Sequence, residues 1–218
     1  MKASLLACAV GAVMAVSAHA QVWNEAGDAG DMPGTSQSVV GVGPLTDIFG
    51  AVSVTSDADI YRIYITDPSL FSATTNSAPG TMTDTTLYLF NLDGTGIAKN
   101  DDVSGSNFLS DLPGGNPLYN ALAPGEYLLA VAGFAFAPYF VSPPSSIADL
   151  IFDVNVFTGV LGPQAGAAGM PMLGWANAGM YDSGTYHITL RGAGFTVPAP
   201  ASLALLGLGG LVATRRRR

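Results

Sequence analysis

The densest group of metal-ligand side chains lies in the segment 91–102, Asn-Leu-Asp-Gly-Thr-Gly-Ile-Ala-Lys-Asn-Asp-Asp. Calcium takes about six to eight oxygen ligands, which carboxylates, Asn side chains and backbone carbonyls on a glycine-bent loop can supply. If this loop folds back on itself, it could bring four ligands onto one Ca²⁺ ion: Asp93, Asn100, Asp101 and Asp102. It is not an EF-hand, because Asn100 rather than Glu occupies the twelfth position. The alternative is an Asx-rich turn whose side chains cap their own backbone.

Two further acidic groups precede this loop. Glu25, Asp28 and Asp31 recur every third residue near a glycine-rich stretch. Asp57 and Asp59 occupy alternate positions at the start of a predicted strand, so their side chains point to the same side. In both groups the pattern favours a solvated edge of the fold over a metal site.

Catalytic patterns are sparse. His187 is the one histidine outside the first twenty residues, and its alternation with Tyr186 and Ile188 predicts a surface position on a strand. No Gly-x-Ser-x-Gly elbow or glycine-rich phosphate loop leading into a helix occurs. Two carboxylates could form a glycosidase pair, but a chain with sixteen acidic residues always offers some pair. We expect a protein that is not an enzyme, and a carboxylate-based surface hydrolase stays as the weaker alternative.

The charge and the cysteine content limit the classes of molecule and metal that the protein can bind. Outside the terminal segments the basic residues are Arg62, Lys99 and Arg191, against the sixteen acidic residues of the chain. This excess of acids excludes nucleic acid binding and favours divalent cations or basic partners. The one cysteine, Cys8, lies in the N-terminal apolar segment, so the body has no thiol for a disulfide or a zinc site. A lipobox around Cys8 is a minor alternative.

The elements that would position these side chains are strands. Alternation with period two appears in five short segments, 59–65, 86–90, 127–131, 150–156 and 186–191, with turn residues between them. Both faces of 86–90 are apolar and therefore look covered. Strands without intervening helices predict an all-β fold, an antiparallel, jelly-roll-like β-sandwich forming a single domain over residues 21–196.

The segment 159–180 is rich in Gly, Ala and Met and lacks a clear period. It predicts a long apolar loop in which Trp175 packs against the sandwich. If exposed, four aromatic side chains would suit stacking on sugar rings: Tyr61, Tyr64, Tyr88 and Trp175.

The N-terminal residues 1–20 predict a signal peptide. Met1 and Lys2 precede an apolar stretch, which ends in a small-x-small motif formed by Ala18 and Ala20. Cleavage after Ala20 would make Gln21 the first residue of an exported protein.

The C-terminal residues 197–218 also have the composition and order of a targeting signal. Val197, Pro198, Ala199 and Pro200 precede an apolar run over 201–213, and the chain ends in Arg215, Arg216, Arg217 and Arg218. The run would form about 20 Å of helix, short for a hydrocarbon core of about 30 Å. The arginines would hold it on the cytoplasmic side, giving a transient inner-membrane stage. A plain tail anchor is the alternative.

This order of motif, apolar run and arginine cluster resembles the PEP-CTERM sorting signal, with Ala199 in place of the usual Glu. The resemblance implies recognition by an exosortase-type processing enzyme. It also implies delivery to the surface of an exopolysaccharide-producing bacterium, where the protein is attached or released.

The body resembles bacterial pre-peptidase C-terminal domains and the related DVUA0089-type domains. The resemblance rests on short motifs within 57–61, 85–94, 100–102 and 123–127. It implies a β-sandwich in an accessory domain of a secreted protein, and some members of the family bind calcium or polymeric ligands.

These observations give one leading function and one alternative besides the hydrolase. The leading function is a non-catalytic protein of the cell surface or the extracellular (biofilm) matrix, structural or adhesive within exopolysaccharide. The alternative is a calcium-dependent carbohydrate- or protein-binding module. No cofactor other than Ca²⁺ is expected, and the expected partners are the exosortase and extracellular polysaccharide.

Overall fold

The computed structural model describes residues 21–77, 80–142, 148–177 and 182–196. Its elements are strands and one short 3₁₀ helix at Ala165–Ala167. Among these residues, no helix has the length and apolar character that crossing a membrane requires.

Two larger sheets form the body. The first sheet has the strand order β1 (Gln21–Asn24), β3 (Leu45–Val52), β13 (Gly184–Arg191), β5 (Ser72–Thr74) and β8 (Asp111–Leu112). The central sheet has the order β14 (Ala193–Gly194), β4 (Ala58–Ile65), β9 (Gly125–Gly133), β6 (Thr85–Phe90) and β7 (Gly96–Asn100), with β2 (Gln37–Ser38) beside β4. A third, small sheet has the order β11 (Ala148–Leu150), β10 (Phe136–Val141) and β12 (Gly174–Asn177).

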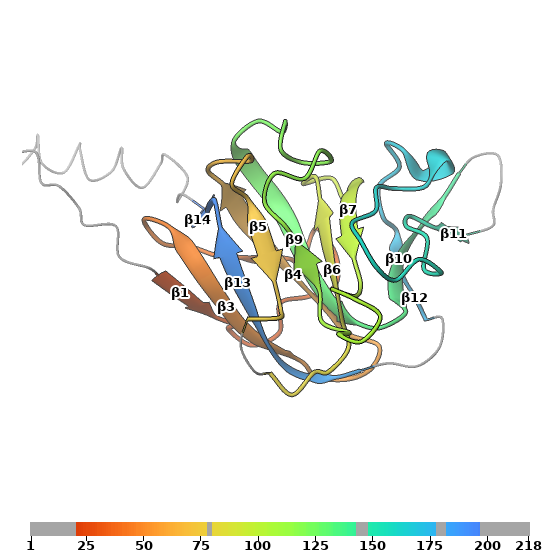
Figure 1. Cartoon of the computed structure of the whole chain (residues 1–218), viewed down its shortest axis with the longest axis horizontal. Coiled ribbons are helices and arrows are strands. Elements are labelled where there is room, and N and C mark those ends of the chain that lie inside the picture. Colours follow the sequence, from red (N-terminus) through yellow and green to blue (C-terminus); the bar gives the residue numbers. More distant parts are fainter. Residues whose placement is uncertain (1–20, 78–79, 143–147, 178–181, 197–218) are drawn as a thin grey trace, which may run out of the picture.

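Pairing is antiparallel throughout the centre of each sheet, and the parallel pairs are β1 with β3 and β2 with β4. In Figure 1, β1, β3 and β13 of the first sheet lie to the left, β4, β6, β7 and β9 of the central sheet occupy the middle, and β10 to β12 lie to the right. The predicted all-β sandwich is confirmed.

The central sheet is covered on both faces. Alternate residues of β4, β6 and β9 pack against the first sheet, including Tyr61, Leu87 and Leu129 with Ile48 and Ile188 of the first sheet. The intervening residues form a second core with the small sheet and its loops: Ala58, Ile60, Tyr88, Phe90, Leu128, Ala130, Phe136, Phe140, Phe152 and Met172. This double burial explains why both faces of 86–90 are apolar, because neither face meets water.

The apolar segment 159–177 contributes to this second core. Trp175 stacks on Phe136 with ring centroids 5.3 Å apart, and it meets Tyr88 edge-on at 5.4 Å. Its indole N–H donates to the carbonyl of Asp31 at 2.6 Å. The expected packing of Trp175 is therefore confirmed. The expectation of a loop is wrong for 174–177, which form β12 because β10 supplies their hydrogen-bond partners.

Candidate functional site

The predicted calcium loop is a β-hairpin. Asp93 lies in the turn between β6 and β7, where one carboxylate oxygen accepts bonds from the backbone N–H of Thr95 at 2.9 Å and from its hydroxyl at 2.8 Å. Gly94 follows with φ of 85°, the left-handed region that glycine tolerates best. Asp93 thus caps its own turn, as the alternative interpretation of the segment predicted.

The side chain of Asn100, at the end of β7, is also hydrogen-bonded to the backbone. Its side-chain oxygen accepts the N–H of Asp111 at 2.7 Å, and its amide donates to the carbonyl of Gly159 at 3.0 Å. Because β7 separates Asp93 from Asp101 and Asp102, the turn and these two aspartates lie at opposite ends of the hairpin. The structure does not bring the four predicted ligands into one site.

The base of the hairpin instead forms a carboxylate group, here called the hairpin cluster: Asp84, Asp101 and Asp102. Each offers a carboxylate oxygen, and these oxygens lie within 4.8 Å of one another. Antiparallel pairing of Leu87 with Asn100 explains this, because it brings the residue before β6 beside the residues after β7. Sequence reasoning missed Asp84, although pairing across the Asp93-Gly94 turn could have indicated it.

The hairpin cluster is partly compensated by Lys99. Its ammonium group lies 3.3 Å from Asp101, and both side chains are 2% exposed. Asp101 also accepts the hydroxyl of Thr86 at 2.5 Å. Burial and the negative charges of Asp101 and Asp102 raise the pKa of Asp84 to about 7, and burial beside Asp101 raises that of Asp102.

A second group, here called the N-terminal cluster, consists of Glu25, Asp28 and Asp59. Their carboxylate oxygens also lie within 4.8 Å of one another. Glu25 follows β1, Asp28 lies in the next loop, and Asp59 belongs to β4. Sequence analysis treated these residues as two separate solvated edges. That interpretation is wrong for Asp59, which is fully buried because β4 is an inner strand of the central sheet, and for Asp57, which is 8% exposed.

Backbone groups hold the first two members in place. The carboxylate oxygens of Glu25 accept the N–H groups of Ala29 at 3.0 Å and Ala51 at 2.8 Å. Asp28 accepts the N–H of Gly30 at 3.5 Å. The loop after β1 is thereby folded so that both carboxylates approach Asp59.

Asp59 ends a chain of buried hydroxyl groups. The hydroxyl of Tyr186 donates to one carboxylate oxygen at 2.6 Å, and the hydroxyl of Tyr61 lies 2.5 Å from that of Tyr186. The other oxygen of Asp59 has no hydrogen-bond partner among the described residues. Burial first, and the charges of Glu25 and Asp57 second, raise the pKa of Asp59 to about 8. A buried carboxylate with an unpartnered oxygen, next to two more carboxylates, is suited to holding a cation.

The surroundings of the N-terminal cluster add negative charge. Asp57 accepts the backbone N–H of Ser53 at 2.8 Å and its hydroxyl at 3.0 Å, and Asp31 has a pKa raised by burial and then by Asp57 and Asp28. Ion pairs between described residues involve Arg62, Lys99 and His187, and none includes a member of this cluster. No basic side chain therefore neutralises it within the described part of the chain.

His187 does not occupy the surface position that sequence analysis predicted. It is 9% exposed, its ring stacks on Phe49 with centroids 4.1 Å apart, and Nε2 lies 2.7 Å from a carboxylate oxygen of Asp47. The prediction is wrong because Phe49, the residue opposite His187 on β3, stacks on the ring and shields it from water. Nδ1 has no hydrogen-bond partner, so among the described residues no serine completes a Ser-His-Asp site.

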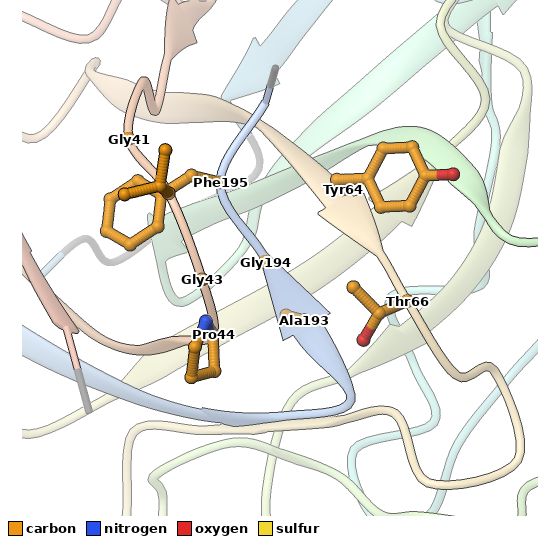
Figure 2. Close-up of a pocket in the computed structure, with 9 residues that line it drawn as sticks. Gly41, Gly43, Pro44, Tyr64, Thr66, Ala193, Gly194 and Phe195 are labelled. Carbon is orange, nitrogen blue, oxygen red and sulfur yellow. The ribbon is translucent and has the colours of Figure 1, made fainter. Parts of the chain in front are cut away.

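A pocket of about 520 Å³ lies where the described chain ends, and Figure 2 shows its lining residues, Phe195, Tyr64 and Pro44 among them. It is mainly apolar and contains no acidic or basic side chain. Beside it, the backbone N–H of Thr196 donates to the carbonyl of Val39 at 2.8 Å. The chain is therefore fixed to the sandwich up to residue 196.

The segment that begins at residue 196 is the part of the chain that matches a known family. Residues 196–218 match the family model of the PEP-CTERM protein-sorting motif. The chain carries a PEP-CTERM sorting signal. This signal implies an exported, cell-surface-directed protein, sorted by an exosortase-type enzyme.

The remaining parts of the PEP-CTERM prediction lie outside the described residues. These are the motif residues Val197 to Pro200 and Arg215 to Arg218. The residues Ala18 and Ala20 of the separately predicted signal peptide also lie outside the described residues. Gln21, the expected first residue of the exported protein, is the first residue of β1. Comparison with curated proteins and with solved structures gave no match to the chain. The resemblance of the body to pre-peptidase C-terminal domains stays a prediction.

Proposed function

We propose that the exported body is a non-catalytic, calcium-stabilised β-sandwich with a structural or adhesive role in the exopolysaccharide matrix at the cell surface. The observation that carries the calcium part is the N-terminal cluster, in which buried Asp59, with one oxygen unpartnered among the described residues, is grouped with Glu25 and Asp28. The sorting signal supports the surface location.

Calcium at this cluster would connect distant parts of the fold. Glu25 belongs to the loop after β1, and Asp59 belongs to β4 of the central sheet. The ion would supply the positive charge that the described side chains do not, and its oxygen-only ligands match calcium rather than zinc. It would therefore fasten the N-terminal loop to the sandwich and stabilise the protein in a calcium-containing exterior.

The burial of the carboxylates supports a non-catalytic role. Asp59 is fully buried and Asp101 is 2% exposed, so a polymeric substrate does not reach them. Two of the aromatic residues that sequence analysis considered for sugar stacking, Tyr61 and Tyr88, are at most 1% exposed and belong to the cores. A carbohydrate-contacting surface would instead use exposed rings such as Phe108 and Phe157, which are 49% and 43% exposed.

The experiment is thermal unfolding of the purified protein in EDTA and in millimolar Ca²⁺. A site filled at about 100 times its dissociation constant adds about 2.7 kcal/mol, so we expect a clear rise in Tm with calcium. Asp28→Asn removes a ligand that is exposed and lies outside the cores, and it should make the rise clearly smaller. Asp149→Asn, at an exposed position outside both clusters, is the matched control. A Tm that does not respond to calcium would overturn the proposal.

A further inference from the structure

The hairpin cluster lies at the same end of the central sheet as the N-terminal cluster but on its other face. Asp59 shares its side of β4 with Tyr61, which packs against the first sheet. Thr86 and Tyr88, which face the second core, lie on the side of β6 where Asp101 accepts the Thr86 hydroxyl. The two carboxylate groups are therefore separated by the sheet and can be tested independently.

One carboxylate oxygen of the hairpin cluster is shut off from water without a hydrogen-bond donor among the described residues, and a second carboxylate of the cluster also lacks a described donor. One carboxylate oxygen of Asp84 is buried and has no hydrogen-bond partner in the described part of the chain. Asp102 is 7% exposed, and no described residue donates a hydrogen bond to its carboxylate, although its backbone N–H is paired with Phe157. Buried carboxylates normally accept several hydrogen bonds, because an unpaired buried charge is costly. A ligand that supplies positive charge would remove this cost.

The charge count of the cluster matches a dication. Three carboxylates face one ammonium group, that of Lys99, which leaves an excess of two negative charges when all are ionised. Asp182 lies close enough to raise the pKa of Asp84, but one of its oxygens already accepts the N–H and the hydroxyl of Thr83 and the N–H of Asp84. The carboxylates that still lack a described hydrogen-bond donor are thus those of Asp84, at one oxygen, and Asp102.

We propose that Asp84, Asp101 and Asp102 form a second calcium site, independent of the N-terminal cluster. Calcium is the cation that this donor set suits, because all the ligands are carboxylate oxygens and neither histidine nor cysteine lies in the cluster. The site fastens the base of the β6–β7 hairpin to the loop at Phe157, whose carbonyl accepts the N–H of Asp102 at 3.0 Å. It deepens the proposed function by adding a second point at which calcium holds the body together.

The test is isothermal titration of the calcium-free full-length protein with CaCl₂. The proposal predicts two bound Ca²⁺ ions for the unchanged protein and one for Asp102→Asn. Asp28→Asn should also bind one ion, the one at the hairpin cluster. A protein that binds one ion, lost in Asp28→Asn and kept in Asp102→Asn, would overturn this inference and leave the proposed function standing. A protein that binds one ion, lost in Asp102→Asn and kept in Asp28→Asn, would support this second site and overturn the calcium site proposed at the N-terminal cluster.

A second measurement separates loss of a ligand from loss of folding. In EDTA, Asp102→Asn relieves repulsion among the three carboxylates, so its Tm should equal or exceed that of the unchanged protein. In millimolar calcium the order should reverse, because the variant lacks the ion that stabilises the original. A variant that is less stable by the same amount in both conditions would show a purely structural role for Asp102 and contradict the site.

Discussion

The carboxyl group of Asp59 is fully buried and receives one hydrogen bond, from Tyr186. Burial and the neighbouring charges raise its pKa to about 8, so in the calcium-free protein it holds a proton at neutral pH. A cation binding there displaces that proton. Calcium affinity should therefore weaken as the pH falls below about 8.

The same shift predicts how the calcium-free protein responds to pH. Because the folded pKa of Asp59 lies above its ordinary value of 3.8, the folded state binds the proton more tightly than the unfolded state. This contribution to stability is complete below about pH 4 and is lost as the pH rises through about 8. Asp84, with a pKa of about 7, acts in the same direction. Urea unfolding in EDTA should show a free energy of unfolding that falls between about pH 5 and pH 8.

Asp59→Asn provides the control for this pH dependence. An amide of nearly the same shape does not titrate, so the variant should lose part of the fall in stability. A free energy of unfolding that rises with pH in the unchanged protein would contradict the assignment.

Gly50 makes room for the tyrosine pair beside Asp59. A Cβ atom at this position on β3 would lie against the Tyr186 hydroxyl and 2.7 Å from the Tyr61 hydroxyl. Gly50→Ala should therefore destabilise the protein by about 1–3 kcal/mol, the usual cost of overpacking. Gly34→Ala, where a Cβ atom meets nothing within 4 Å, is the matched control. Equal midpoints of urea unfolding for the two variants would contradict the tight packing.

At the scale of residues, the sequence shows which side chains could bind a metal ion better than it shows which of them lie together in the fold. Asp101 and Asp102 are in a carboxylate cluster, but their partner Asp84 comes from the other strand of the hairpin. Asp59 is grouped with Glu25 and Asp28 through packing between distant strands. Local spacing carries no information about such contacts.

At the scale of elements, alternation predicted β4, β6 and β9, whose two faces meet different cores, and also β13. It was wrong for 150–156, because β11 ends at Leu150, the residues after it form bends and turns, and Val156 is 40% exposed. The third sheet could not be predicted in this way. β12 has no alternating pattern, and it is a strand because β10 offers it hydrogen-bond partners. The burial of His187 was also missed, because alternation does not reveal that Phe49 of the neighbouring strand stacks on its ring.

The second core should contribute strongly to stability. Phe90 is fully buried and packs on Phe152, with ring centroids 6.0 Å apart. Phe90→Ala should cost about 3–5 kcal/mol, as expected for a buried aromatic side chain. Phe108→Ala, at a ring 49% exposed, should change the free energy of unfolding by about 0.5 kcal/mol or less. Similar losses in the two variants, measured by urea unfolding, would contradict a well-packed second core.

At the scale of the whole molecule, the two ends of the described body meet. Gln21 pairs with Leu45, Thr196 bridges to Val40, and both partners belong to one segment, 40–45 (Figure 1). Gly194 pairs with Tyr64, near the end of β4 that lies opposite Asp59. The point at which the sorting signal joins the body is therefore remote from the N-terminal cluster. Processing of the tail and binding of calcium should not interfere with each other.

The most direct test of the account is the native mass of the protein recovered from the cell-surface and medium fractions of its host. We predict a polypeptide that begins at Gln21, lacks residues 201–218 and carries at least one calcium ion that EDTA removes. A polypeptide that keeps Arg215 to Arg218 would contradict exosortase processing. A correctly processed polypeptide with no bound calcium would contradict the calcium-stabilised sandwich.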